Sequence, residues 1–122
     1  MLSKFSKNVA PFVTAEIDLA LKARSSGDAA LEFTHLENAH IIGQESTYWH
    51  VRVHFLMLQW AVRNLCVGEF LGQVVRILGA ATKTVFGLVP QGNTGGANVS
   101  PFKAMPIKPE HSEIINRAKV LA

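Results

Sequence analysis

The sequence predicts an all-α protein of two stacked antiparallel helical hairpins, closed by an extended C-terminal segment and a short terminal helix. Three observations predict this fold class. Apolar residues recur three and four positions apart through residues 12–86, no convincing run with a period of two interrupts them, and no proline occurs between Pro11 and Pro90. A chain of 122 residues that is 48% hydrophobic should form one domain with a well-filled core.

Three breaks divide this helical region into four helices. The Ser-Ser-Gly-Asp stretch at residues 25–28 ends one helix and caps the next, residues 43–46 form a second break, and residues 67–69 form a third. The predicted helices therefore span residues 12–25, 28–42, 47–66 and 69–86.

The two hairpins resemble each other. A shift of 41 positions places Gly27-Asp28 on Gly68-Glu69, and it matches four further pairs: Ile17 with Leu58, Ala20 with Ala61, Leu36 with Ile77, and Ala39 with Ala80. Hairpins of this kind occur in tetratricopeptide-like and other α-solenoid proteins, although their usual period of about 34 is shorter. Chance agreement between two amphipathic hairpins is the alternative explanation.

Residues 87–109 are predicted to cap the open end of the hairpins, because about three repeats are normally needed for a stable stack. Prolines hold the residues before them in extended conformations. The segment also has too many apolar residues for a solvated linker, namely Val89, Val99, Phe102, Met105 and Ile107. We expect these side chains to insert between the helices, followed by a helix over residues 110–121. A mobile tail or recognition arm is the alternative.

A glycine-rich motif opens this segment. It lacks the spacing of a phosphate-binding loop and no strand precedes it. We predict a structural turn instead, in which glycines adopt positive φ and polar side chains bond their own backbone. The residues assigned to this tail motif are Gly92, Asn93, Thr94, Gly95, Gly96 and Phe102.

Charge and cysteine content exclude several classes of protein. The net charge is only +3 and no two basic residues are adjacent, so we expect no nucleic-acid partner. Glu69, Arg76 and Lys83 interrupt the longest low-charge stretch, so we expect no membrane span. The single cysteine, Cys66, cannot form an internal disulfide, and no secretory leader opens the chain. A cytoplasmic protein is therefore expected.

Four of the five histidines fall around the second predicted break. His50 and His54 share one face of the predicted helix 47–66 with Met57 and Ala61. The polar stripe of that helix lies elsewhere, at Arg52, Gln59 and Arg63. Both histidines should therefore be buried, and buried imidazoles need partners for their nitrogens. Histidines at i and i+4 can also place two nitrogens on one metal ion.

His40 is the predicted third member of this cluster. It lies five residues from His35, so only one of the two can easily face the other helix. A site of His40, His50 and His54, with a carboxylate from Glu37 or Glu45, would suit zinc, copper or nickel. The HxxxH spacing alone has low specificity, and core histidines that bond to backbone or carboxylate groups are commoner than metal ligands. The favoured interpretation of the three residues is therefore a set of structural buried histidines, and a metal site is the alternative.

Catalysis has little support in the sequence. Cys66 has the neighbours of a small core hydrophobe. Glu16 is placed for partial burial near a histidine, which leaves an acid–base enzyme as one alternative. We assign no catalytic residue and no certain cofactor. The favoured interpretation is a non-catalytic helical-hairpin protein that acts as a binding or adaptor module for an unknown ligand, for which a protein or peptide is one candidate. A histidine-based metal-binding protein is the runner-up.

Several motifs together resemble a family of small bacterial proteins known only as a domain of unknown function. The likeness covers residues 27–109, and its tail motif is the specific part. It rests on His35-Leu36-Glu37-Asn38-Ala39-His40, Gly43-Gln44, His50, His54, Gly72-Gln73, the tail motif at 92–96 and Met105-Pro106-Ile107. The resemblance implies a bacterial, cytoplasmic origin and brings no catalytic residues.

Overall fold

The computed structural model describes residues 2–85, 90–100 and 102–121, with the side chains of 81–85 outside the description, and it confirms the all-α class. The described residues form five helices and no strand. The helices are α1 (Lys4–Ser25), α2 (Ala29–Gly43), α3 (Thr47–Arg63), α4 (Val67–Val85) and α5 (Pro109–Val120). Within the described residues, none of these helices has the length and apolarity to cross a membrane.

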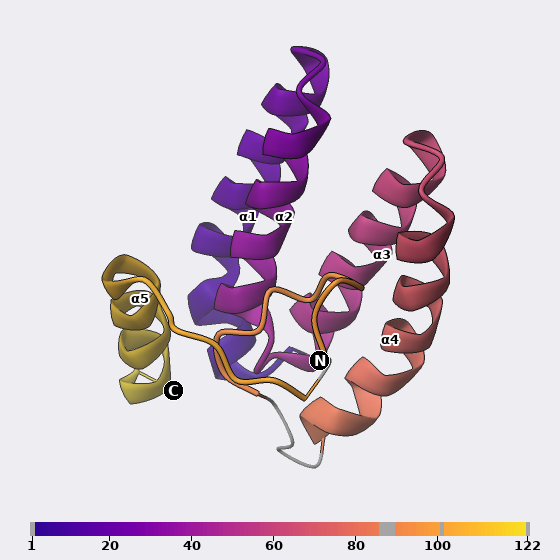
Figure 1. The fold of residues 1–122 in the computed structure, drawn as a ribbon. Coiled ribbons are helices and arrows are strands. Elements are labelled where there is room, and N and C mark those ends of the chain that lie inside the picture. The colour runs from indigo at the N-terminus through magenta and orange to yellow at the C-terminus, as the bar shows by residue number, and fades with distance from the viewer. Residues whose placement is uncertain (1, 86–89, 101, 122) are drawn as a thin grey trace.

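The helices are arranged in two antiparallel pairs (Figure 1). The most extensive contacts are between α1 and α2 and between α3 and α4, while α2 joins the pairs by packing on α3. The pairs diverge at one end and approach each other near the turn between α2 and α3, where the extended residues 90–100 and 102–108 cross them. α5 packs on α1 and α2. A cluster of buried side chains joins α1, α2, α3 and α5: Val9, Val13, Ala20, Leu36, Ala39, Ile42, Trp49, Val53, Met57 and Ala118.

The first helix begins earlier than predicted. α1 starts at Lys4, after Ser3 accepts a hydrogen bond from the backbone N–H of Ser6 at 3.1 Å. Pro11 therefore lies inside the helix. Because proline has no N–H, the carbonyl of Lys7 lacks its helical hydrogen bond, and Lys7 is exposed to solvent. The prediction of a start at residue 12 was wrong because an N-terminal cap and the buried Val9 stabilise two further turns.

The third break also differs from the prediction. α3 ends at Arg63, because Leu65 has a φ of 53° that no continuing helix can accommodate. α4 then begins at Val67, so the break lies at residues 64–66 instead of 67–69. The other predicted ends agree within a residue among those described, and residue 86 lies outside the described residues.

The extended segment packs against the helices mainly through its backbone. Gly92, Asn93, Gly95 and Gly96 are buried, and Gly92 and Gly95 have the positive φ expected of glycines in a turn. Phe102 is 72% exposed, so its predicted insertion between the helices was wrong. The physical reason is that the carbonyls of Ser100 and Lys103 both accept from the Asn93 amide at 2.7 Å, which ties this stretch inward through its main chain. Val99, Met105 and Ile107 are partly buried, and Val89 lies outside the described residues.

Candidate metal centre

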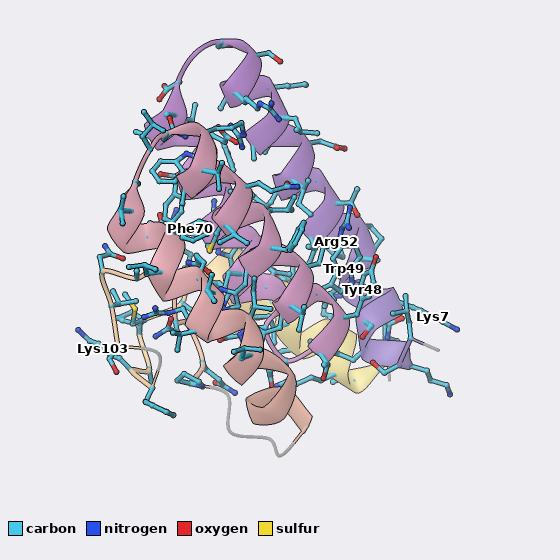
Figure 2. The ribbon with its side chains drawn as sticks, turned by 90° about the vertical axis from the view of Figure 1, so that its right-hand side faces the viewer. Lys7, Tyr48, Trp49, Arg52, Phe70 and Lys103 are labelled. Atoms are coloured by element: carbon cyan, nitrogen blue, oxygen red, sulfur yellow. The ribbon has the colours of Figure 1, made fainter. Side chains whose placement is uncertain are left out.

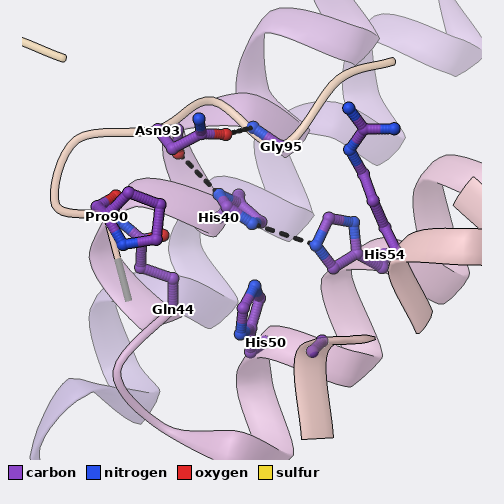
Figure 3. Close-up of a pocket in the computed structure, with 9 residues that line it drawn as sticks. His40, Gln44, His50, His54, Pro90, Asn93 and Gly95 are labelled. Atoms are coloured by element: carbon purple, nitrogen blue, oxygen red, sulfur yellow. Dashed lines mark hydrogen bonds between the residues drawn. The ribbon is translucent and has the colours of Figure 1, made fainter. Parts of the chain in front are cut away.

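Three histidines form a buried cluster where the helix pairs meet. His40 comes from the last turn of α2, and His50 and His54 come from successive turns of α3 (Figure 3). Their exposed fractions are 2%, 4% and 2%. One ring nitrogen from each lies within 4.8 Å of the others. The predicted trio is therefore brought together, and the helical spacing of His50 and His54 places them on the buried face as expected.

The backbone of the tail motif orients His40. The carbonyl oxygen of Asn93 lies 2.7 Å from Nδ1 of His40. A carbonyl can only accept, so Nδ1 carries the proton and donates it. In a neutral ring, Nε2 of His40 is then left with a lone pair directed toward His54.

Gln73 of α4 orients His54 in the same way. Its Nε2 amide group donates to Oε1 of Glu69 at 2.8 Å and to the carbonyl of Gly95 at 2.9 Å, which fixes the orientation of the amide. Oε1 of Gln73 therefore faces Nδ1 of His54, at 2.6 Å. Nδ1 must donate here as well, and Nε2 of neutral His54 also carries a lone pair.

If both rings are neutral, these two lone pairs face each other. The Nε2 atoms of His40 and His54 are 3.1 Å apart, as one of the dashed lines in Figure 3 marks. Two acceptors at this distance repel unless a proton or a cation lies between them. Two nitrogens on one tetrahedral zinc ion, each bonded at 2.0–2.1 Å, lie about 3.3 Å apart. The observed separation is therefore close to that of a shared metal ion.

A small cavity adjoins the three rings. Its volume is about 10 Å³, and its lining includes the three histidines together with Gln44 and Arg76. A polar cavity of this size holds roughly one water molecule or one ion. The cavity is thus matched to a single small occupant, with little room for an organic ligand.

Gly95 closes the cluster on the side of His40. It has a φ of 85°, and a Cβ built on it would lie 2.6–2.8 Å from three atoms of the His40 ring. Only glycine provides both this backbone conformation and this close approach. The tail motif therefore packs directly on a candidate ligand, which its classification as a structural turn did not anticipate.

Two charged groups beside the extended segment have shifted pKa values. Burial raises the pKa of the Glu37 carboxyl, and repulsion from Glu69 adds to this, while a hydrogen bond from Thr94 opposes it. Arg76 donates to the carbonyl of Val99 at 2.6 Å, and burial lowers its pKa against the opposing effect of Glu69. Neither Glu37 nor Arg76 belongs to the group of candidate ligands.

The predicted carboxylate ligands are not in the cluster. Glu45 pairs with Lys119 at 3.0 Å, and Glu37 lies near Thr94 and Glu69. Within the described residues, the ligand group contains the three histidines alone. The assignment of Glu37 or Glu45 was therefore wrong, because packing between distant elements turns both carboxylates to other partners.

Glu16 and His35 form a separate pair. Oε2 of Glu16 lies 2.7 Å from Nδ1 of His35 and also accepts from Asn38 at 3.3 Å. Neither residue lines the cavity beside the cluster. The partial burial expected for Glu16 is confirmed, and its contact with His35 joins α1 to α2. Cys66 is partly buried.

Gln73 and Asn93 were missed as groups that orient the histidines. Gln73 is fully buried and Asn93 is 2% exposed. A signal for Gln73 was present, since it is a polar residue within an apolar helix and belongs to the Gly72-Gln73 motif. The role of Asn93 depends on a contact across 53 positions of the chain, which local sequence patterns do not reveal.

The fold and the cluster together define a small helical protein with a buried set of three histidines. The chain belongs to the family described as "Protein of unknown function (DUF3703)", whose model matches residues 7–115. This confirms the resemblance to a domain of unknown function. No curated protein and no solved structure matches the chain.

Proposed function

We propose that this protein binds one divalent transition-metal ion, such as zinc, copper or nickel, through His40, His50 and His54. One observation carries the proposal. The Nε2 atoms of His40 and His54 face each other at 3.1 Å, while both Nδ1 atoms donate to oxygen acceptors. A metal ion between these nitrogens would bond to both of them, whereas without a metal one of the two Nε2 atoms must carry a proton to donate to the other.

The surroundings of the histidines support this function. Histidine ligands in metal sites usually donate their second ring nitrogen to a carbonyl or carboxylate, which fixes the ring and makes the ligand more basic. The Asn93 carbonyl and the Gln73 amide oxygen would serve in this way. Neutral imidazole ligands suit zinc, copper and nickel and offer little to calcium or magnesium.

Three protein ligands leave a fourth position open on a tetrahedral ion. The cavity of about 10 Å³ would supply space for a water molecule or a small anion there. Arg76 lines the same cavity, and its positive charge favours an anion such as hydroxide over a neutral ligand. This protein would thus hold its metal in an open coordination state.

The test is metal binding by purified protein stripped with a chelator. Isothermal titration with zinc should show one ion per chain, and His50→Ala should abolish this binding. His50 is the best ligand to remove, because the hydrogen bonds that orient His40 and His54 remain. The matched control is His35→Ala, which removes a partly buried histidine outside the cluster and should leave zinc binding unchanged.

Metal binding should also stabilise the folded state. Zinc at 100 times its dissociation constant would raise the free energy of unfolding by about 2.7 kcal/mol. In the absence of metal, His50→Ala should cost on the order of 1–3 kcal/mol through lost packing and unpaired partners. If the chelator-treated protein stays folded and does not bind added zinc, copper or nickel, the histidines are structural, and His40 and His54 share a proton.

Other parts of the sequence-based interpretation stay predictions. The two antiparallel pairs, with α2 packed on α3, agree with a stacked-hairpin arrangement. Its likeness to a tetratricopeptide-like solenoid rests on the sequence repeat alone. An adaptor role with a protein or peptide partner is the second candidate function. A bacterial, cytoplasmic origin likewise rests on the resemblance.

A further inference from the structure

Helix α4 directs its apolar side away from the protein. Its apolar residues at 67, 70, 71, 74, 75 and 78 are between 36% and 75% exposed. Its polar residues Glu69 and Gln73 are instead buried, at 9% and 0%. Figure 2 views the molecule from this side, with α4 in front and Phe70 labelled on it. A helix of a free-standing protein normally has the opposite orientation.

The inward polar side has a structural cause. Gln73 orients His54, Glu69 accepts from the backbone of Ala97 at 2.9 Å, and Arg76 donates to Val99. These contacts join α4 to the extended segment and to the histidine cluster. The apolar side is therefore forced outward, and an apolar surface of this extent marks an interaction site.

The exposed residues are arranged symmetrically along the helix. Val67 and Leu78, Phe70 and Val75, and Leu71 and Val74 are pairs equally distant from the midpoint between residues 72 and 73. Two antiparallel copies of α4, related by a two-fold axis through that midpoint, would place an apolar residue opposite each apolar residue. Such a self-complementary patch is what a symmetric dimer requires.

The spacing also favours a helix as the partner. Val67, Leu71, Val74 and Leu78 follow one another at intervals of four, three and four residues, the period of side chains at a helix–helix contact. A membrane surface is less suited, because helices that lie on membranes carry a basic polar face. The polar face of α4 carries Glu69, Gln73 and Arg76, and it is turned inward.

We propose that a second copy of this chain covers the outer face of α4, through an antiparallel, two-fold symmetric pairing of the two α4 helices. Large apolar side chains present on the order of 150 Å² each when fully exposed, so the six residues offer roughly 500 Å² per copy. Stable specific dimers bury about 600–1,000 Å² per partner, so this interface is smaller than those and falls among weak, transient contacts. The dimer should therefore dissociate reversibly on dilution.

Analytical ultracentrifugation of the full chain over a wide concentration range is the first test. The wild-type protein should shift from monomer to dimer as concentration rises. The double variant Leu71→Glu/Val74→Glu should weaken the dimer by roughly 100-fold or more, because each interface would then hold four carboxylates. The matched control is Leu21→Glu on α1, which is 51% exposed and outside this face, and it should dimerise as the wild type does.

Charge exchange then tests the pairing itself. The double variant Leu71→Lys/Val74→Lys should also be monomeric alone, and an equimolar mixture with the glutamate variant should restore a heterodimer. Both positions are exposed in the monomer, so circular dichroism and the unfolding free energy of each monomer should remain near the wild type. Restoration by mixing would exclude loss of folding as the cause of dissociation.

Disulfide formation tests the direction of the helices. In a Cys66→Ser background, Leu71→Cys mixed with Val74→Cys should crosslink under mild oxidation, and Leu71→Cys alone should crosslink poorly. Efficient crosslinking of Leu71→Cys alone would overturn the antiparallel pairing. A wild-type protein that stays monomeric at millimolar concentration would overturn the dimer, and binding of that monomer to phosphatidylglycerol vesicles would assign the face to a membrane.

Discussion

Replacing Gly95 with alanine should weaken both the fold and the metal site. Gly95 has a φ of 85°, and its new Cβ would meet Cδ2, Cγ and Nε2 of His40 at 2.6–2.8 Å. A side chain in this left-handed conformation costs about 1–2 kcal/mol. The contacts require the imidazole or the backbone to move by several tenths of an ångström, which adds on the order of 1–2 kcal/mol in a packed site. We therefore expect Gly95→Ala to lower the free energy of unfolding by about 2–4 kcal/mol in total.

Gly27→Ala is the matched control for this substitution. Gly27 has a similar φ of 76°, and a Cβ built on it meets nothing within 4 Å. Gly27→Ala should therefore lower the free energy of unfolding only by the cost of the left-handed conformation, about 1–2 kcal/mol. The difference between the two variants isolates the contact between Gly95 and His40.

The assay has two readouts. Urea unfolding of the metal-free proteins gives the difference in stability, and zinc titration gives the effect on the site. Displacement of His40 should lower zinc affinity by about 10- to 100-fold in Gly95→Ala, with no change in Gly27→Ala. Equal stability losses in the two variants, together with wild-type zinc affinity, would show that Gly95 does not position His40.

Two further substitutions test the groups around the cluster. Gln73→Met removes the acceptor for Nδ1 of His54 and should lower zinc affinity by about 10- to 100-fold, whereas Gln59→Met on the exposed side of α3 should have no effect in the same titration. Glu37→Gln should stabilise the protein at pH 7 by less than about 1 kcal/mol, because burial, with repulsion from Glu69, raises the pKa of this half-buried carboxyl. The folded state then binds the proton more tightly than the unfolded chain, so the wild type loses stability as pH rises above the ordinary value of 4.5. Urea unfolding at pH 4 and pH 7 should therefore show the advantage of the variant at the higher pH only, and an equal difference at both pH values would contradict this assignment.

Local patterns in the sequence predicted much of the helical fold. Helical periodicity and the breaks near Gly27 and Gly43 determine where the first two turns fall, since these signals act over a few residues. Pro11 and Leu65 show the limit of such patterns. A capped helix with one buried face tolerates the exposed proline, and a single left-handed residue ends α3 where the apolar period continues.

The histidine cluster was predictable for a similar reason. His50 and His54 are one turn apart, and the turn after His40 folds the next helix back on it. The orientation of the rings could not be predicted from local sequence patterns, because it depends on Asn93 and Gln73, which are distant in sequence. The prediction that Phe102 inserts between the helices was wrong for a related reason, since apolar character predicts burial only where the backbone leaves room for the side chain.

The most direct test of the metal centre is anomalous diffraction from crystals grown with zinc, recorded on both sides of its absorption edge. We predict one anomalous peak per chain, about 2.0–2.1 Å from Nε2 of His40 and Nε2 of His54 and within bonding distance of a ring nitrogen of His50. Nδ1 of His40 should still donate to Asn93, and Nδ1 of His54 to Gln73. A map without an anomalous peak at the cluster, in crystals where those two Nε2 atoms remain about 3.1 Å apart, would contradict metal binding and favour a shared proton.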